Sequence, residues 1–297
     1  MYKINNLENN KNIEVKKELG SFKVLEHEKD LSVNHGEAQN AYYQSLMNVR
    51  RRQLMCDVSL SDVVVQAGAM QWMAGNVKAT TGIKGAGDLI SKAFKAKASN
   101  ESIIKPEYTG DGTLMLEPTY KHIILIDTRE WNGSVVLEDG LFLANESSLN
   151  YQIRRRSNLS SALAGNEGLF NLALHGQGVV ALESPVPKEE LIEVHLENDV
   201  LKIDGNMAIA WSDTLEFTVE RAGKSLLGSA ASGEGLVNVY RGSGKVLLSP
   251  VPWTLALSEN VNSENNGNSV RDNKRKVNSE NDFLNEGINM ISDYLKD

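Results

Sequence analysis

An internal repeat constrains this chain more than any other feature of its sequence. A segment that begins Gly-x-Gly, continues through a short apolar run and ends at proline occurs at residues 110–118, 176–185 and 242–250. The three segments begin 66 residues apart. In a second register, residues 143–153 match residues 209–219, again 66 apart. A period of this length predicts tandem copies of one small structural unit.

The repeated segment predicts a β-strand with defined ends. Glycine permits a backbone with positive φ, and proline cannot donate a hydrogen bond to a neighbouring strand. The glycines expected at these positions are Gly110, Gly112, Gly176, Gly178, Gly242 and Gly244. We therefore expect an all-β fold of three pseudo-threefold, sandwich-like or barrel-like units at about 50–130, 131–196 and 197–257.

The region 50–257 also shows period-two alternation of apolar and polar residues between turn signals, as in residues 207–219. Asn132-Gly133 and Asn198-Asp199 each separate two such apolar runs. These dipeptides predict two β-hairpins with tight turns. A Gly-, Ala- and Lys-rich insertion near residues 84–105 predicts a loop or short helix outside the sheet.

The flanking regions have a different composition. Residues 1–49 are charged and rich in asparagine, which predicts an N-terminal arm with a helical turn or two at 41–49. Residues 258–281 are polar and predict a disordered linker. Within the final segment, 282–297, the spacing of Leu284, Ile288, Ile291 and Leu295 predicts a short amphipathic helix over 282–295. This helix either packs on its own protein or is available to a protein or membrane partner.

Composition excludes several classes of protein. The single cysteine, Cys56, cannot form an intramolecular disulfide or a cysteine-based zinc site, and its strand-like surroundings favour a small core residue. The net charge of −8 opposes indiscriminate binding to nucleic acid. Without an apolar signal region or membrane-spanning run, we expect a cytoplasmic protein.

The segment Gln-Ala-Gly-Ala-Met-Gln-Trp-Met at 66–73, the Gly-Ile-Lys-Gly segment at 82–85 and the three Gly-x-Gly strands together resemble the altered-inheritance-of-mitochondria family of mitochondrial-biogenesis proteins. The resemblance covers about residues 50–257. It implies three copies of the β fold of the tryptophan RNA-binding attenuator protein and a homotrimer whose nine units close a ring. Bacterial and archaeal members have no assigned function, whereas eukaryotic members are linked to inner-membrane organisation in mitochondria.

Two clusters of residues outside the three Gly-x-Gly segments are candidate binding sites. Arg154, Arg155 and Arg156 form a basic patch that suggests nucleic acid, but no aromatic side chain interleaves with the arginines. We therefore expect these arginines, like the run 50–52, to be solvated or to pair between subunits. Gly82, Gly85 and Gly87 could form an anion- or ligand-binding loop, although the context lacks the order of a dinucleotide-binding motif.

The sequence contains no pattern that predicts catalysis. No two of the five histidines have the i, i+4 spacing of a helical metal site, and no nucleophile elbow is present. We predict no catalytic residues, no cofactor and no metal. The expected function is a non-catalytic oligomeric binding or scaffold protein. A nucleic-acid-binding ring, a membrane-associated organising protein and an enzyme with a site between subunits are the alternatives.

Overall fold

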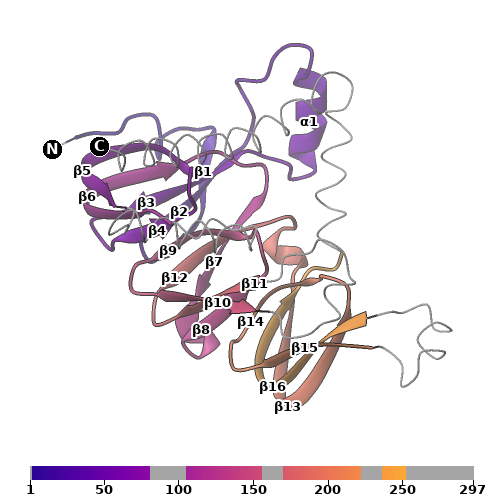
Figure 1. Cartoon of the computed structure of the whole chain (residues 1–297). Coiled ribbons are helices and arrows are strands. Elements are labelled where there is room, and N and C mark those ends of the chain that lie inside the picture. The colour runs from indigo at the N-terminus through magenta and orange to yellow at the C-terminus, as the bar shows by residue number, and fades with distance from the viewer. Residues whose placement is uncertain (1, 81–104, 156–169, 222–235, 252–297) are drawn as a thin grey trace, which may run out of the picture.

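The computed structural model describes residues 2–80, 105–155, 170–221 and 236–251 (Figure 1). These residues form mostly β structure, arranged as two antiparallel sheets of nine and seven strands. In Figure 1 the N-terminal strands, in indigo, lie at the upper left of the molecule, and the C-terminal strands, in orange, lie at the lower right. No helix within the described ranges is long and apolar enough to cross a membrane.

The nine-stranded sheet contains the N-terminal half of the fold. Its order is β1 (Ile13–Leu19), β2 (Phe22–His27), β3 (Arg52–Asp57), β6 (Glu107–Leu116), β4 (Val63–Val65), β9 (Phe142–Glu146), β12 (Val179–Ser184) and β7 (His122–Asp127), with β5 (Met70–Thr80) paired to β6.

The seven-stranded sheet contains the remaining strands. Its order is β10 (Asn150–Arg155), β11 (Phe170–His175), β8 (Ser134–Leu137), β14 (Ala208–Trp211), β16 (Leu236–Leu248) and β13 (Ile192–Asp204), with β15 (Glu216–Arg221) paired to β16. The described helical segments are α1 (Ala38–Leu46) and the short 3-10 helices η1 (Thr128–Trp131) and η3 (Lys188–Glu190).

The Gly-x-Gly segments lie where a strand changes its pairing partner. β6 pairs with β4 before Gly110 and with β3 after it, and β16 pairs with β15 before Gly242 and with β14 after it. The middle segment interrupts the strand, because β11 lies in the seven-stranded sheet and β12, which follows Gly176, lies in the other. The three glycines have φ values of 112°, 123° and 116°, a region that favours glycine.

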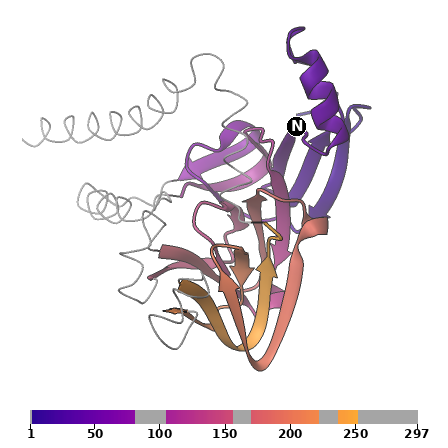
Figure 2. The same ribbon diagram turned by 90° about the vertical axis from the view of Figure 1, so that its right-hand side faces the viewer.

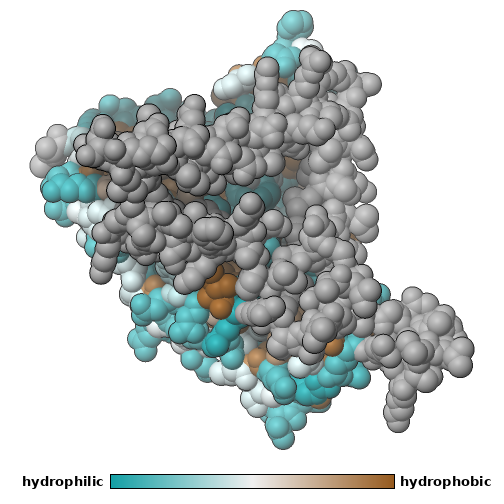
Figure 3. Space-filling view, viewed as in Figure 1, coloured by the Kyte–Doolittle hydropathy of each residue, from teal (hydrophilic) through white to brown (hydrophobic). Residues whose placement is uncertain are grey.

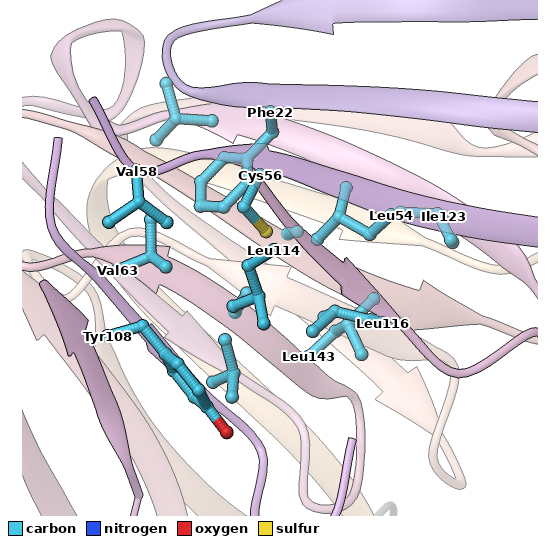
Figure 4. Packing of buried hydrophobic residues seen from close by; sticks show 14 of the residues in the cluster. Phe22, Leu54, Cys56, Val58, Val63, Tyr108, Leu114, Leu116, Ile123 and Leu143 are labelled. Carbon is cyan, nitrogen blue, oxygen red and sulfur yellow. The ribbon is translucent and has the colours of Figure 1, made fainter. Parts of the chain in front are cut away.

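The buried hydrophobic residues of the described chain form four clusters, of which three are large. The first lies within the nine-stranded sheet and includes Phe22, Leu54 and Leu114 (Figure 4). The second joins the two sheets, and the third lies within the seven-stranded sheet around Trp211 and Tyr240. Because side chains from both sheets contribute to the second cluster, its packing holds the sheets together.

Cys56 lies in the first cluster, between Phe22 and Leu114 (Figure 4). Its side chain is fully buried, and this burial raises the pKa of the thiol. The residue is therefore part of the packed core.

The two predicted hairpins are wrong. β7 and β8 flank Asn132-Gly133 but belong to different sheets, so the turn is a corner between layers. Asn198 and Asp199 lie inside the continuous strand β13, where its register against β16 shifts between Leu196 and Asp199. Positive φ at Asn198 (53°) accommodates this bulge.

The N-terminal region differs from the expected arm. β1 and β2 form a hairpin whose second strand pairs with β3, and the side chains of Phe22, Val24 and Leu25 are buried. Residues 13–27 therefore belong to the β body, whereas α1 projects from it (Figures 1 and 2). The predicted insertion near 84–105, except Lys105, the linker 258–281 and the C-terminal segment 282–297 lie outside the described residues.

Candidate binding pocket

A pocket of about 340 Å³ opens at one end of the nine-stranded sheet. It lies at the carboxyl ends of β4, β6 and β12 and at the start of β9. Its lining residues are Gln66, Ala67, Gly68, Ala69, Glu117, Pro118, Thr119, Gly140, Phe142, Leu143 and Glu183. Four segments that are far apart in the sequence therefore meet at this site.

Two glycine turns shape the rim of the pocket. Gly68 and Gly140 have φ values of 80° and 78°, and the turn at Gly68 is closed by the bond from the Ala69 N–H to the Gln66 carbonyl oxygen. A Cβ atom added at either glycine would meet no atom within 4 Å. The glycines are therefore required by backbone conformation at this site, and the space beside them is open.

Two lysines beside the pocket bind side chains that line it. The Lys105 Nζ atom lies 3.9 Å from the centroid of the Phe142 ring and donates a 3.1 Å hydrogen bond to Gln66 Oε1. The Lys121 Nζ atom donates to Glu183 Oε2 at 2.7 Å. Such groups can orient a polar ligand through charge and hydrogen bonds. The titratable side chains of the lining are the carboxyl groups of Glu117 and Glu183.

A buried ion pair lies next to the pocket. Thr119, a lining residue, exchanges two backbone hydrogen bonds with Arg52, of 2.7 and 2.8 Å. The guanidinium of Arg52 contacts Glu26 at 2.7 Å, and the Arg52 residue is only 3% exposed. The expectation that the run 50–52 is solvated is wrong for this residue, because strand pairing between β2 and β3 places Glu26 directly opposite Arg52.

The same cluster holds the end of α1. Arg52 Nη2 donates to the carbonyl oxygen and the side-chain oxygen of Asn48, at 2.9 and 2.8 Å. Arg50 contacts Glu26 at 3.3 Å and donates from Nε to the Ser45 carbonyl oxygen at 3.1 Å. The arginines therefore tie the carboxyl end of α1 to the β body.

His122 begins β7 beside this cluster. Burial, together with the nearby positive charge of Arg52, lowers its pKa from about 6.5 to about 4, while Glu189 opposes the shift. The imidazole is therefore neutral near pH 7. Within the described residues, no group of three or more His, Cys, Asp or Glu side chains could hold a metal ion.

Of the three arginines predicted as a basic patch, only Arg154 has a side chain that the structure describes. Arg154 contacts Asp213 at 2.7 Å, and His175 lies 3.3 Å from the same carboxylate. Arg155 ends β10, and Arg156 lies outside the described residues. Gly82, Gly85 and Gly87 also lie outside them.

Sequence reasoning missed the pocket itself. In the sequence, residues 66–69 are distinctive only as part of a family resemblance. No local pattern marks Lys105, Phe142 or Glu183 as residues of a binding site. A glycine turn after an apolar run and the prolines after each repeated strand mark ends of strands. These residues do not indicate which strand ends are neighbours in the folded protein.

Comparison with known proteins gives three consistent matches. The family model described as "Mitochondrial biogenesis AIM24" matches residues 47–251. An uncharacterized protein of Streptococcus pyogenes serotype M6 is 29% identical over 194 residues, which cover 63% of this chain and 75% of that protein. A crystal structure of a Streptococcus pyogenes protein aligns with a TM-score of 0.52 and 25% identity, covering 72% of this chain and 94% of the other.

Proposed function

This chain belongs to the mitochondrial biogenesis AIM24 family, and on that premise we propose that it is a non-catalytic binding or scaffold protein that acts as an oligomer. The proposed assembly is a homotrimer that associates through the edges of its β-sheets. Its three units would each resemble the fold of the tryptophan RNA-binding attenuator protein, and the proposed location is the cytoplasm.

The observation that carries this proposal is the presence of two edge strands, β10 and β13, at the ends of the seven-stranded order; β15 also pairs with β16 alone. β10 pairs only with β11, and β13 pairs only with β16, among the strands that the structure describes. Tyr151 and Ile153 on β10 are each 40% exposed, and Ile192 and Val200 on β13 are 52% and 46% exposed. Most of the visible described surface is hydrophilic (Figure 3). Strand edges that expose large apolar side chains favour pairing with another chain.

Two different edges favour a head-to-tail assembly. If β10 of one copy pairs with β13 of the next, an open assembly has one unused β10 edge at one end and one unused β13 edge at the other until it closes into a ring. Closure removes all of these edges. The positive φ of Gly110, Gly176 and Gly242, which lie 66 residues apart, supports three similar units in each copy.

Binding is favoured over catalysis by the chemistry of the described sites. The pocket offers carboxylates, amides and a hydroxyl, and the thiol of Cys56 is buried away from it. These groups suit recognition of a polar partner.

Light scattering coupled to size exclusion tests the assembly directly. We expect the full chain to elute as a trimer at micromolar concentration. The double variants Tyr151→Lys/Ile153→Lys on β10 and Ile192→Lys/Val200→Lys on β13 should each be monomeric, because lysine opposes pairing at a strand edge. Leu60→Lys is the matched control, since Leu60 is 69% exposed but lies outside both edges, and it should remain trimeric.

Mixing the two double variants distinguishes a ring from a symmetric contact. Each variant retains the edge that the other has lost, so a head-to-tail assembly predicts a heterodimer and no larger species. A monomeric parent chain would refute the oligomer, and retention of the trimer in both double variants would refute assembly through these edges.

A further inference from the structure

Helix α1 exposes an apolar stripe although the helix is firmly attached at one end. None of its residues is buried. Tyr42, Tyr43, Leu46 and the following Met47 are between 58% and 78% exposed, and their spacing places them along one side of the helix. Both views of the ribbon show α1 standing away from the sheets (Figures 1 and 2).

The intrinsic stability of α1 is too low to explain why this segment is helical. Nine residues are too few for a stable isolated helix in water, and helices in proteins are held mainly by packing of an apolar face. Arg50 and Arg52 hold the carboxyl end of α1 through Ser45 and Asn48, but they leave its apolar stripe without a neighbour among the described residues.

We propose that this stripe is the docking site for the C-terminal segment 282–297 of the same chain. The spacing of Leu284, Ile288, Ile291 and Leu295 gives that segment one apolar side, the complement that a helix with a single apolar stripe requires. Helix α1 and the segment 282–297 both lie outside residues 47–251, the part of the chain that the family model matches. The two extensions of this chain would therefore form one accessory structure.

Charge favours this occupant. The segment 282–297 carries four acidic side chains and one lysine, a side-chain net charge of −3 in a chain whose net charge is −8. α1 contains no charged residue, so the segment meets no like charge on that helix. Arg50 and Arg51, which follow α1, are partly exposed and add a positive edge to the site.

The length of the intervening chain permits the contact. The 30 residues 252–281 would have a root-mean-square span of about 30 Å as a flexible coil. A compact chain of 297 residues has a radius of gyration of about 19 Å, and the fully extended linker spans up to about 100 Å, so the contact is within reach. Tethering at this length corresponds to an effective concentration on the order of millimolar, which favours the chain's own segment over that of a separate molecule at micromolar concentration.

Hydrogen exchange on the full-length protein tests the proposal. We expect the backbone amides of α1 to exchange at least about tenfold more slowly in the parent chain than in Ile288→Asp/Ile291→Asp, because the acidic substitutions disrupt the apolar side of the segment. Asn289→Asp is the matched control, since it adds the same kind of charge at a polar position and should preserve protection. Unchanged exchange in the double variant would overturn the proposal, provided that β3 and β6 remain protected in all three proteins.

A cysteine pair identifies the occupant. Leu46→Cys combined with Ile288→Cys should oxidise to a closed single chain, with the buried Cys56 unaffected. A disulfide that joins two chains would overturn docking within one chain and assign the site to another copy. Absence of any disulfide, with normal exchange of the core, would also refute the contact. Both readouts are independent of the strand edges, because the edge variants leave 38–47 and 282–297 intact.

Discussion

Glu26 and Arg52 face each other across the β2–β3 pair, with a distance of 2.7 Å between Oε2 and Nη2. Both side chains are buried, and Arg50 adds a second contact to the same carboxylate at 3.3 Å. This ion pair connects three parts of the molecule, because Arg52 also binds Asn48 after α1 and pairs through its backbone with Thr119 at the pocket.

We predict that Glu26→Gln lowers the free energy of unfolding by about 3 kcal/mol, because it leaves the buried guanidinium of Arg52 without its counter-charge. Urea denaturation followed by circular dichroism measures this change. Glu14→Gln, which removes a carboxylate more than half exposed on β1, should stay within about 0.5 kcal/mol of the parent. Equal effects of the two substitutions would contradict a special role for the buried pair.

Cys56 should be unreactive in the folded protein. Its thiol lies in the first hydrophobic cluster, and burial raises its pKa, so little thiolate is available to an alkylating reagent. We expect iodoacetamide to modify it at least about 100-fold more slowly than in urea-unfolded protein. In Leu60→Cys, the added thiol on an exposed turn should react rapidly under native conditions. Complete native modification of Cys56 within minutes would be inconsistent with the structure.

The stability of the protein should decrease as the pH falls from about 6.5 to 4. In this interval the unfolded chain protonates His122, whereas burial keeps the folded imidazole neutral because its pKa is about 4. Unfolding therefore takes up a proton and becomes easier at lower pH. We expect this residue to account for about 1 to 2 kcal/mol after allowance for solvent screening.

His122→Gln should remove that part of the pH dependence, measured as the difference in unfolding free energy between pH 7 and pH 4.5. The parent chain, measured in the same way at both pH values, is the reference. A His122→Gln protein with the slope of the parent would show that another group causes the decrease.

Two glycines with positive φ should respond differently to alanine. At Gly110 a Cβ atom would collide with the backbone carbonyl oxygen of Asn76 in the paired strand β5, whereas at Gly140 it would meet nothing within 4 Å. We therefore expect Gly140→Ala to cost about 1 kcal/mol from backbone strain alone and Gly110→Ala to cost at least about 3 kcal/mol. Thermal or urea unfolding of the two variants measures the difference, and equal costs would contradict a steric role at Gly110.

The repeat was a strong guide to local structure and a poor guide to pairing. Apolar alternation correctly indicated mostly β structure in the described parts of 50–257, and the apolar surroundings of Cys56 correctly indicated a core residue. Asn132-Gly133 and Asn198-Asp199 permit positive φ, which is needed equally at a hairpin, a corner between sheets or a bulge. A dipeptide signal of this kind therefore cannot identify which of the three occurs.

The sequence by itself determined the composition of each strand, the 66-residue period and the places where the backbone requires glycine, because these depend on neighbours along the chain. Only the tertiary structure decided that β11 and β12 enter different sheets, that Glu26 lies opposite Arg52, and that Gln66, Phe142 and Glu183 share one pocket. Those contacts join residues separated by 26 to 117 positions. They depend on how the hydrophobic clusters pack against one another, and no local pattern encodes that packing.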